Sequence, residues 1–320
     1  MISAVLGVVG AVVFGSADFL GGLAAKRLRS ITVTAIAAAA GLVGLLVAYP
    51  FIGGAWAATD VAWGALSGVF GVIAIVLLYA CLAIGPMSIL SPLTAVVSAI
   101  APMLWGLLVK GEQLSGFGFL GLFVALVAVV LVGFIPGAAV VRPSLRGILM
   151  AIGSGVAIGA FMVSIDLTSD ESGLVPLILN RAVNGAIAWT IVAVLVILTA
   201  RRRRIAPALE RRVGATPTGH ADLEQASGPA PRTPSPDALA GAVRTGILLA
   251  VSCGVVDAVA NTVMLIALRL GDLSIVSVLT AMYPAGTIIL AAIVLRERIA
   301  VVQWIGLALA LSAGALFALA

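Results

Sequence analysis

The stretch Gly85-Pro-Met-Ser-Ile-Leu-Ser-Pro-Leu-Thr-Ala95 returns later in the chain as Gly271-Asp-Leu-Ser-Ile-Val-Ser-Val-Leu-Thr-Ala281. Seven of the eleven paired positions are identical. A long polar insert separates the two copies, and the surroundings of both copies are apolar. Internal duplication is common in membrane proteins that are built from two related halves. We therefore expect two related halves in this chain.

The composition is that of a membrane protein. Of the 320 residues, 62% are hydrophobic and 10% are charged, and the mean hydropathy is +1.25. A soluble domain has about 25% charged residues, and no core in water would hide so much apolar surface. The net charge of +5 comes mainly from loops beside apolar segments, as membrane orientation requires, so we expect no nucleic-acid partner. The expected location is the cell membrane, crossed several times.

Apolar stretches of about 20 residues predict transmembrane helices, and the chain contains ten. The predicted fold is therefore an all-α membrane protein with ten transmembrane helices. The expected spans are 3–25, 31–52, 61–83, 87–109, 114–135, 145–166, 174–199, 245–268, 272–295 and 299–319.

The ten spans divide into two five-helix repeats, residues 1–136 and residues 145–320. Five is an odd number, so the second repeat enters the membrane in the opposite sense and the repeat is inverted. Residues 200–244 interrupt the second repeat with Arg, Pro, Ala, Thr and Ser and no apolar period, which indicates a disordered linker.

The basic residues predict the orientation. Fifteen of the 18 Lys and Arg residues lie in loops that follow odd-numbered spans. The positive-inside rule places these loops in the cytoplasm and both termini outside. The linker opens with the basic run Arg201–Arg204, which we expect to contact anionic membrane lipid.

Several of these features resemble the EamA family of the drug/metabolite transporter superfamily. They are the plan of five plus five helices, the Gly-Pro-Met-Ser stretch at residue 85, Gly111-Glu112 after the fourth helix and the equivalent Arg296-Glu297. Phe14-Gly-Ser-Ala-Asp-Phe-Leu-Gly-Gly22 resembles a subgroup with Gly-x-x-Asp-Phe-Leu-Gly-Gly at the end of the first helix, where Phe14 replaces the usual Trp. The resemblance implies export of amino acids, other metabolites or toxic compounds. Relatives more often have cytoplasmic termini, so the charge count departs from the family pattern.

Polar groups inside the membrane are costly and mark candidate functional sites. Asp257 is the deepest ionisable residue, with Asn261 on the same helical face, and Asn180 and Arg181 lie in the preceding helix. Asp257 is expected either to bind a cationic substrate or a proton, or to form a structural ion pair with Arg181.

Two further acidic residues have alternative interpretations. Asp18 shares one helix face with Gly15 and Gly22, so it is either a binding residue or a helix anchor within reach of nearby basic residues. Asp166 ends the sixth span, where we expect interfacial solvation, with pairing to Arg181 as the alternative.

The repeated stretch carries matching Ser and Thr residues on the fourth and ninth helices. The stripes either line a polar cavity between the halves or form a packing seam of small residues. Pro102 and Pro284 are expected to weaken the two helices and support gating. Tyr79 and Tyr283 are candidates for stacking on an organic solute. The stripe residues considered as binding candidates are Ser91 and Thr94 in the first copy, and Ser277 and Thr280 in the second.

Other chemistries find little support in the residue types. His220 is the only histidine and lies in the linker, and Cys81 and Cys253 lie apart in apolar stretches, so we expect no metal and no cofactor. Catalytic pairs and a nucleotide-binding motif are also not visible, so an enzyme is not expected. The leading hypothesis is a secondary transporter that exports a small-molecule substrate by alternating access, either with proton exchange or by facilitated diffusion. The alternatives are translocation of a lipid-linked sugar, or a membrane sensor or scaffold.

Overall fold

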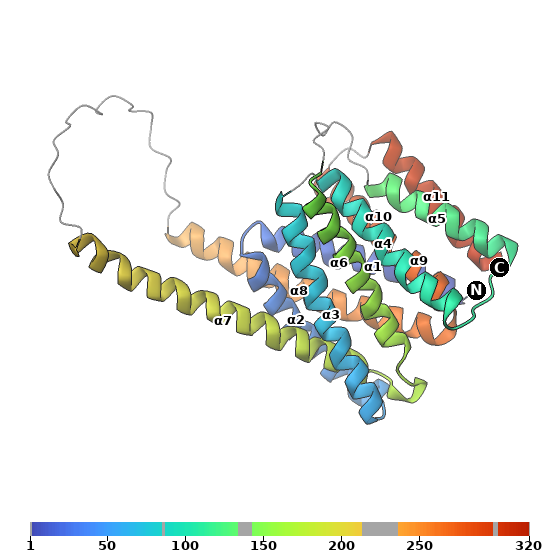
Figure 1. The fold of residues 1–320 in the computed structure, drawn as a ribbon, viewed down its shortest axis with the longest axis horizontal. Helices are drawn as coiled ribbons and strands as arrows, with labels where there is room; N and C mark the ends of the chain where they lie inside the picture. The colour runs from blue at the N-terminus through green and yellow to red at the C-terminus, as the bar shows by residue number, and fades with distance from the viewer. Residues whose placement is uncertain (1, 85–86, 134–142, 213–235, 297–299, 320) are drawn as a thin grey trace.

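The computed structural model describes residues 2–84, 87–133, 143–212, 236–296 and 300–319. Within these ranges all regular structure is helical, which confirms the predicted class (Figure 1). The helices are α1 (Ile2–Ala25), α2 (Ser30–Ile52), α3 (Ala58–Ile84), α4 (Met87–Leu108), α5 (Gly116–Gly133), α6 (Leu145–Asp166), η1 (Asp170–Ser172), α7 (Val175–Arg212), α8 (Pro236–Leu270), α9 (Leu273–Thr280), α10 (Tyr283–Val294) and α11 (Val301–Leu319).

The predicted spans agree with these bounds within a few residues wherever the chain is apolar. Seven of the described helical segments are long and apolar enough to cross a membrane, and three shorter apolar helices accompany them. The shorter helices are Leu93–Leu108, Gly116–Val132 and Val301–Phe317. The chain therefore has the helices of a multi-pass membrane protein.

The span expected at 272–295 consists of two helices. α9 ends at Thr280 and α10 begins at Tyr283, with Pro284 in the first turn of α10. Proline fits this position because the first helical N–H groups have no partner within the helix. The counterpart α4 runs without interruption and contains Pro102. The two halves therefore differ at the break, which lies at Ala281 and Met282.

The ends of the expected linker are helical rather than irregular. α7 continues to Arg212 and α8 begins at Pro236, so both helices project from the bundle on the left of Figure 1. α7 has 38 residues and is therefore about 57 Å long, well beyond the ~30 Å hydrocarbon core. Residues 213–235 lie outside the described part, as do the side chains of Arg201–Arg204, so the expected lipid contact stays a prediction.

The packing of α5 on α11 follows the two-fold relation expected of an inverted repeat. A Cβ on Gly121 would lie 3.2 Å from the Leu316 side chain, and a Cβ on Gly306 would lie 3.0 Å from the Leu131 side chain. Gly121 and Gly306 are equivalent in the two copies, and so are Leu131 and Leu316. Equivalent helices that pack antiparallel through equivalent residues are related by a two-fold axis perpendicular to them.

The other helix contacts come in pairs that exchange under the same relation. α1 packs on α8 and α10, as α6 packs on α3 and α4, and α2 packs on α8 as α7 packs on α3. Glycines bring several of these backbones together. A Cβ on Gly68 would lie 2.7 Å from the Asn180 carbonyl oxygen, and one on Gly155 would lie 2.8 Å from the Thr94 carbonyl oxygen. Such small-residue contacts replace the hydrophobic effect as the source of helix association in lipid.

Candidate functional site

An ion pair joins the second turn of α7 to the middle of α8. The Arg181 guanidinium contacts the Asp257 carboxylate, and both side chains are largely shielded, at 14% and 24% exposed. Asn261 donates its amide hydrogen to the Asp257 carbonyl oxygen at 2.8 Å and to Oδ1 at 3.2 Å. A paired and hydrogen-bonded carboxylate is tolerated in a membrane because its charge is compensated. The predicted residues Asp257, Arg181 and Asn261 therefore lie together.

Two glycines allow the Arg181 side chain to reach α8. A Cβ on Gly41 of α2 would lie 2.9 Å from the Gly254 carbonyl oxygen and 3.6 Å from Arg181 Cδ. α2, α7 and α8 thus meet at one point, one turn of helix from Asp257. The sequence reasoning missed Gly41, because a glycine at a helix crossing has no signal of its own in a chain with 36 glycines.

Asp18 of α1 lies at the same level as Asp257. α1 and α8 run antiparallel, with Gly10 beside Val263 and Gly21 beside Cys253. Asp18 comes three residues before Gly21, so in this antiparallel register it lies beside the residues three or four positions after Cys253, which include Asp257. The charge of Asp257 acts on Asp18, and the charge of Asp18 acts on Tyr283 at the start of α10. The groups of α1, α8 and α10 form one cluster beside the break between α9 and α10.

The exposure of the residues on one face of α1 changes along the helix. Along one helix face, Ala11 and Gly15 are buried, whereas Asp18, Gly22 and Ala25 are exposed. Asp18 lies on the side of α1 opposite to the exposed Val9, because the nine residues between them make about two and a half helical turns. Asp18 is exposed on this face of α1, at the level of the half-buried Asp257 of α8.

α8 shows the same change of exposure at the same level. Cys253 and Asp257 are half-buried, whereas Asn261 and Met264, farther along the same face, are buried. Exposure on these faces of α1 and α8 therefore extends from the bundle end that carries Ala25 to the level of the two carboxylates. Polar groups at this level can bind a solute.

The cluster has an excess of negative charge when all its groups are ionised. Asp257 is paired with Arg181, and among the described residues Asp18 has no ion pair or hydrogen bond. A free carboxylate beside a paired one can accept a cationic group or a proton without breaking an existing contact. The hydroxyl of Tyr283 and the Arg181 guanidinium add donors for an anionic group of the same solute.

The remaining predicted residues lie elsewhere. Asn180 is buried and donates to Ser67 Oγ at 2.9 Å, which fixes α7 on α3. Thr94 donates to the carbonyl oxygens of Leu90 and Ala151, the latter at 3.2 Å. The buried positions of Thr94, Ser277 and Thr280 agree with the packing-seam interpretation in this conformation. The side chains of Tyr79 and Ser91 lie outside the described part of the chain.

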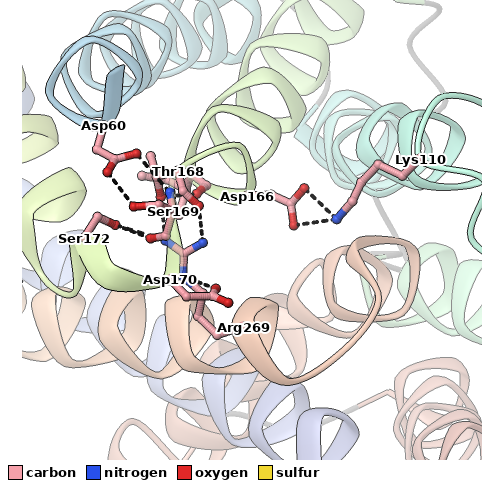
Figure 2. A network of polar contacts seen from close by, with 9 residues as sticks. Asp60, Lys110, Asp166, Thr168, Ser169, Asp170, Ser172 and Arg269 are labelled. Carbon is pink, nitrogen blue, oxygen red and sulfur yellow. Dashed lines mark hydrogen bonds and ion pairs between the residues drawn. The ribbon is translucent and has the colours of Figure 1, made fainter. Parts of the chain in front are cut away.

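A second polar cluster lies at one end of the bundle and includes residues that sequence reasoning did not single out (Figure 2). Asp166 accepts hydrogen bonds from Lys110 Nζ at 2.9 and 3.0 Å. Both expectations for Asp166, solvation and pairing with Arg181, are therefore wrong, since its side chain is 4% exposed and its partner is Lys110. Burial lowers the pKa of Lys110, but Asp166 and Glu112 outweigh this effect and the pKa is raised, so Lys110 is charged.

Arg269, at the end of α8, occupies the centre of the same cluster. Its guanidinium donates to the Thr168 carbonyl oxygen and to Ser172 Oγ, and it lies 3.5 Å from Asp170. Asp60, at the start of α3, accepts from the Ser169 N–H at 2.9 Å and from its hydroxyl at 2.6 Å. These contacts join loops that are far apart in the sequence, so spacing alone does not reveal them.

Comparisons with known proteins agree with this architecture. Residues 231–319 match the sequence model of the EamA-like transporter family. A solved structure, titled only "Crystal structure of protein", shares the fold with a TM-score of 0.68 at 16% identity, over 99% of this chain and 96% of that chain. No curated protein matches the sequence. The chain is thus a multi-pass, all-helical membrane protein whose C-terminal part is similar to the EamA-like transporters.

Proposed function

We propose that the chain is a secondary transporter of the drug/metabolite type, which moves small organic solutes across the membrane by alternating access. The observation that carries this proposal is the cluster of Asp18, Arg181 and Asp257 inside the membrane-spanning part of the bundle. The family match over residues 231–319 supports the same class. The Phe14–Gly22 segment, which suggested a subgroup of this family, is the part of α1 that holds Asp18.

Export is the proposed direction. The exposed face of α1 that holds Asp18 leads to the bundle end that carries Lys26, Arg27 and Arg29, and the positive-inside rule assigns such an end to the cytoplasm. A solute from the cytoplasm would approach Asp18 and Asp257 from this end. An amine, a zwitterion such as an amino acid, or another organic cation would complement the charges of the cluster.

Proton exchange at Asp18 is the proposed coupling. An unpaired carboxylate can hold either a proton or a cationic solute, and exclusion of one by the other couples their movements. Asp257 has its charge partner in Arg181, so Asp18 is the better candidate for this exchange.

The test is solute efflux from proteoliposomes that hold a mixture of amino acids, amines and other metabolites, with and without a pH gradient. Asp18→Asn is expected to abolish the dependence on the gradient, because the amide cannot exchange a proton in this pH range. Exchange between labelled and unlabelled solute at equal pH is expected to remain. Gradient-driven efflux by Asp18→Asn at the parent rate would contradict the coupling, and absence of efflux for every solute class in the parent protein would contradict the transport function.

An apolar groove favours the movement of a lipid-linked solute as a second candidate. It lies on the outside of α2, α7 and α8, has a volume of about 500 Å³ and is open to one side. Its lining includes Val43, Val47, Trp189 and Val255, which suit an acyl or polyprenyl chain. Competition of a long-chain polyprenyl phosphate with the transported solute would support this candidate, and the substitution Gly44→Trp, which fills the groove, tests the location.

A further inference from the structure

The bundle end that holds Lys110 is tied together by polar contacts between the two halves of the chain. The first half contributes Lys110, whose ammonium group bridges to Asp166 of the second half at 2.9 Å. Glu112 of the first half accepts from the Leu273 and Ser274 N–H groups of the second half at 2.9 and 3.0 Å. Hydrogen bonds of this length to a charged group are stronger than hydrogen bonds between neutral groups.

Glu112 holds the first turn of α9. The N–H groups of a first turn have no partners inside the helix and carry the positive end of its dipole, so a carboxylate stabilises them. α9 is eight residues long and ends at the break before Tyr283. Its length of about 12 Å therefore separates the Glu112 contact from the level at which Tyr283 approaches Asp18.

Further contacts between the halves lie at the same end. Asp60 binds Ser169, the Ala55 N–H donates to the Glu171 carbonyl oxygen at 2.7 Å, and the Leu174 N–H donates to the Gly53 carbonyl oxygen at 3.1 Å. A Cβ on Gly54 would lie only 2.1 Å from the Ser172 carbonyl oxygen, so the two loops touch through their backbones. The loop at residues 53–55 is therefore packed directly on the loop at residues 171–174.

The contacts between the halves near the opposite end are mainly apolar. A Cβ on Gly246 would lie 2.9 Å from the Leu28 side chain, and a Cβ on Gly147 would lie 3.3 Å from the Leu90 side chain. Among the described residues in that part of the bundle, the hydrogen bonds between the halves include Gln303 Nε2 to the Val132 carbonyl oxygen at 3.5 Å and Thr94 to the Ala151 carbonyl oxygen at 3.2 Å. Within the described chain, the ion pair between the halves is the one that Lys110 forms with Asp166.

We infer that Lys110, Glu112 and Asp166 form a gate that closes this end of the bundle, with α9 linking the gate to the central cluster. In the structure the gate is closed. Opening the gate requires Lys110 to leave Asp166 and the first turn of α9 to leave Glu112. Because related halves that rock about a two-fold axis open one end as they close the other, loss of these contacts favours the alternate conformation.

The inference rests on the proposed transport function, and its test reads the conformation without a solute. In a chain with Cys81→Ala and Cys253→Ala, one reporter cysteine is placed at Ser277, which is fully buried on α9, or at Gly22, where a side chain meets open space. A membrane-impermeant maleimide is applied to one face of oriented membranes at a time. The parent is expected to react rapidly at position 22 and slowly at position 277.

Lys110→Gln is expected to raise the reaction rate at position 277 about tenfold and to lower the rate at position 22, which corresponds to a population shift of ~1.4 kcal/mol. Glu112→Gln is expected to change both rates in the same directions, since the amide oxygen accepts from fewer N–H groups than the carboxylate does. The opposite signs matter, because general loosening of the fold would raise both rates.

Asp170→Asn is the matched control. Asp170 lies at the same end and pairs with Arg269, but its side chain is 84% exposed and both residues belong to the second half. This variant is expected to leave both labelling rates unchanged. Unchanged rates in both Lys110→Gln and Glu112→Gln, or a parallel rise at both reporters, would overturn the gate. A shift in labelling without any solute flux would fault the proposed function instead.

Discussion

Asp257→Asn is expected to reduce solute flux by about a hundredfold or more, with the protein still inserted in the membrane. The substitution leaves the largely shielded Arg181 guanidinium without its carboxylate partner. A contact of the solute with a charged group contributes ~1.5–3 kcal/mol, and each ~1.4 kcal/mol corresponds to a factor of ten. Initial rates of uptake into proteoliposomes, normalised to the folded protein, measure this effect.

A double variant separates transport from structural support. Arg181→Gln with Asp257→Asn removes both charges, and replacing a whole buried pair by neutral groups is often tolerated. We expect the double variant to recover the thermal stability of the parent in detergent but not its flux. Parent-level flux in the double variant would show that the pair only holds α7 against α8. Asn261→Ala, which removes the donor to Asp257, is expected to give an intermediate loss.

The membrane helices were predictable because the bilayer imposes one simple requirement on the sequence. A span needs about 20 apolar residues, and α1, α6 and most other helices begin and end within a few residues of the apolar stretches. The repeat at Gly85 and Gly271 led to the two-fold relation that the contacts of Gly121 and Gly306 display. Apolarity failed as a guide where α7 and α8 continue beyond the apolar segment, since Ala, Leu, Glu and Arg favour a helix in water as well.

The central cluster was partly predictable for a related reason. Charged residues inside apolar spans are few, so Asp18, Arg181 and Asp257 stood out one by one. That Asp257 pairs with Arg181 was one of two expected outcomes. The level of Asp18 beside Asp257 depends on the antiparallel register of α1 and α8, which no local pattern contains.

The gate residues were the least predictable. Glu112 was noticed as part of the resemblance to a family, but its contact with Leu273 and Ser274 requires the two halves to be docked. Asp166 lies at a helix end, where solvation is the usual outcome for an acidic residue. Its partner Lys110 is brought to it by the packing of α4 on α6. Contacts between loops of different halves follow from tertiary packing rather than from local sequence.

Gly254→Ala is expected to destabilise the protein severely, by more than the ~1–3 kcal/mol that is typical of overpacking. A Cβ at this position of α8 would lie 2.1 Å from the Ala37 carbonyl oxygen and 2.7 Å from Ala37 Cα. These are backbone atoms of α2, so no rotation of a side chain relieves the clash. α2 and α8 therefore have to move apart, which also disturbs the close packing of Gly41 against Gly254 and Arg181.

Gly44→Ala and Gly22→Ala are the matched controls, and the expected change in stability has the opposite sign. A Cβ at either glycine meets no atom within 4 Å. Alanine in a helix is favoured over glycine by ~0.5–1 kcal/mol, so both controls are expected to be as stable as the parent or slightly more so. Thermal unfolding of the purified variants, followed by size-exclusion chromatography in detergent, distinguishes the two cases. A stable Gly254→Ala variant would contradict the close approach of α2 and α8, on which the position of the Arg181–Asp257 pair depends.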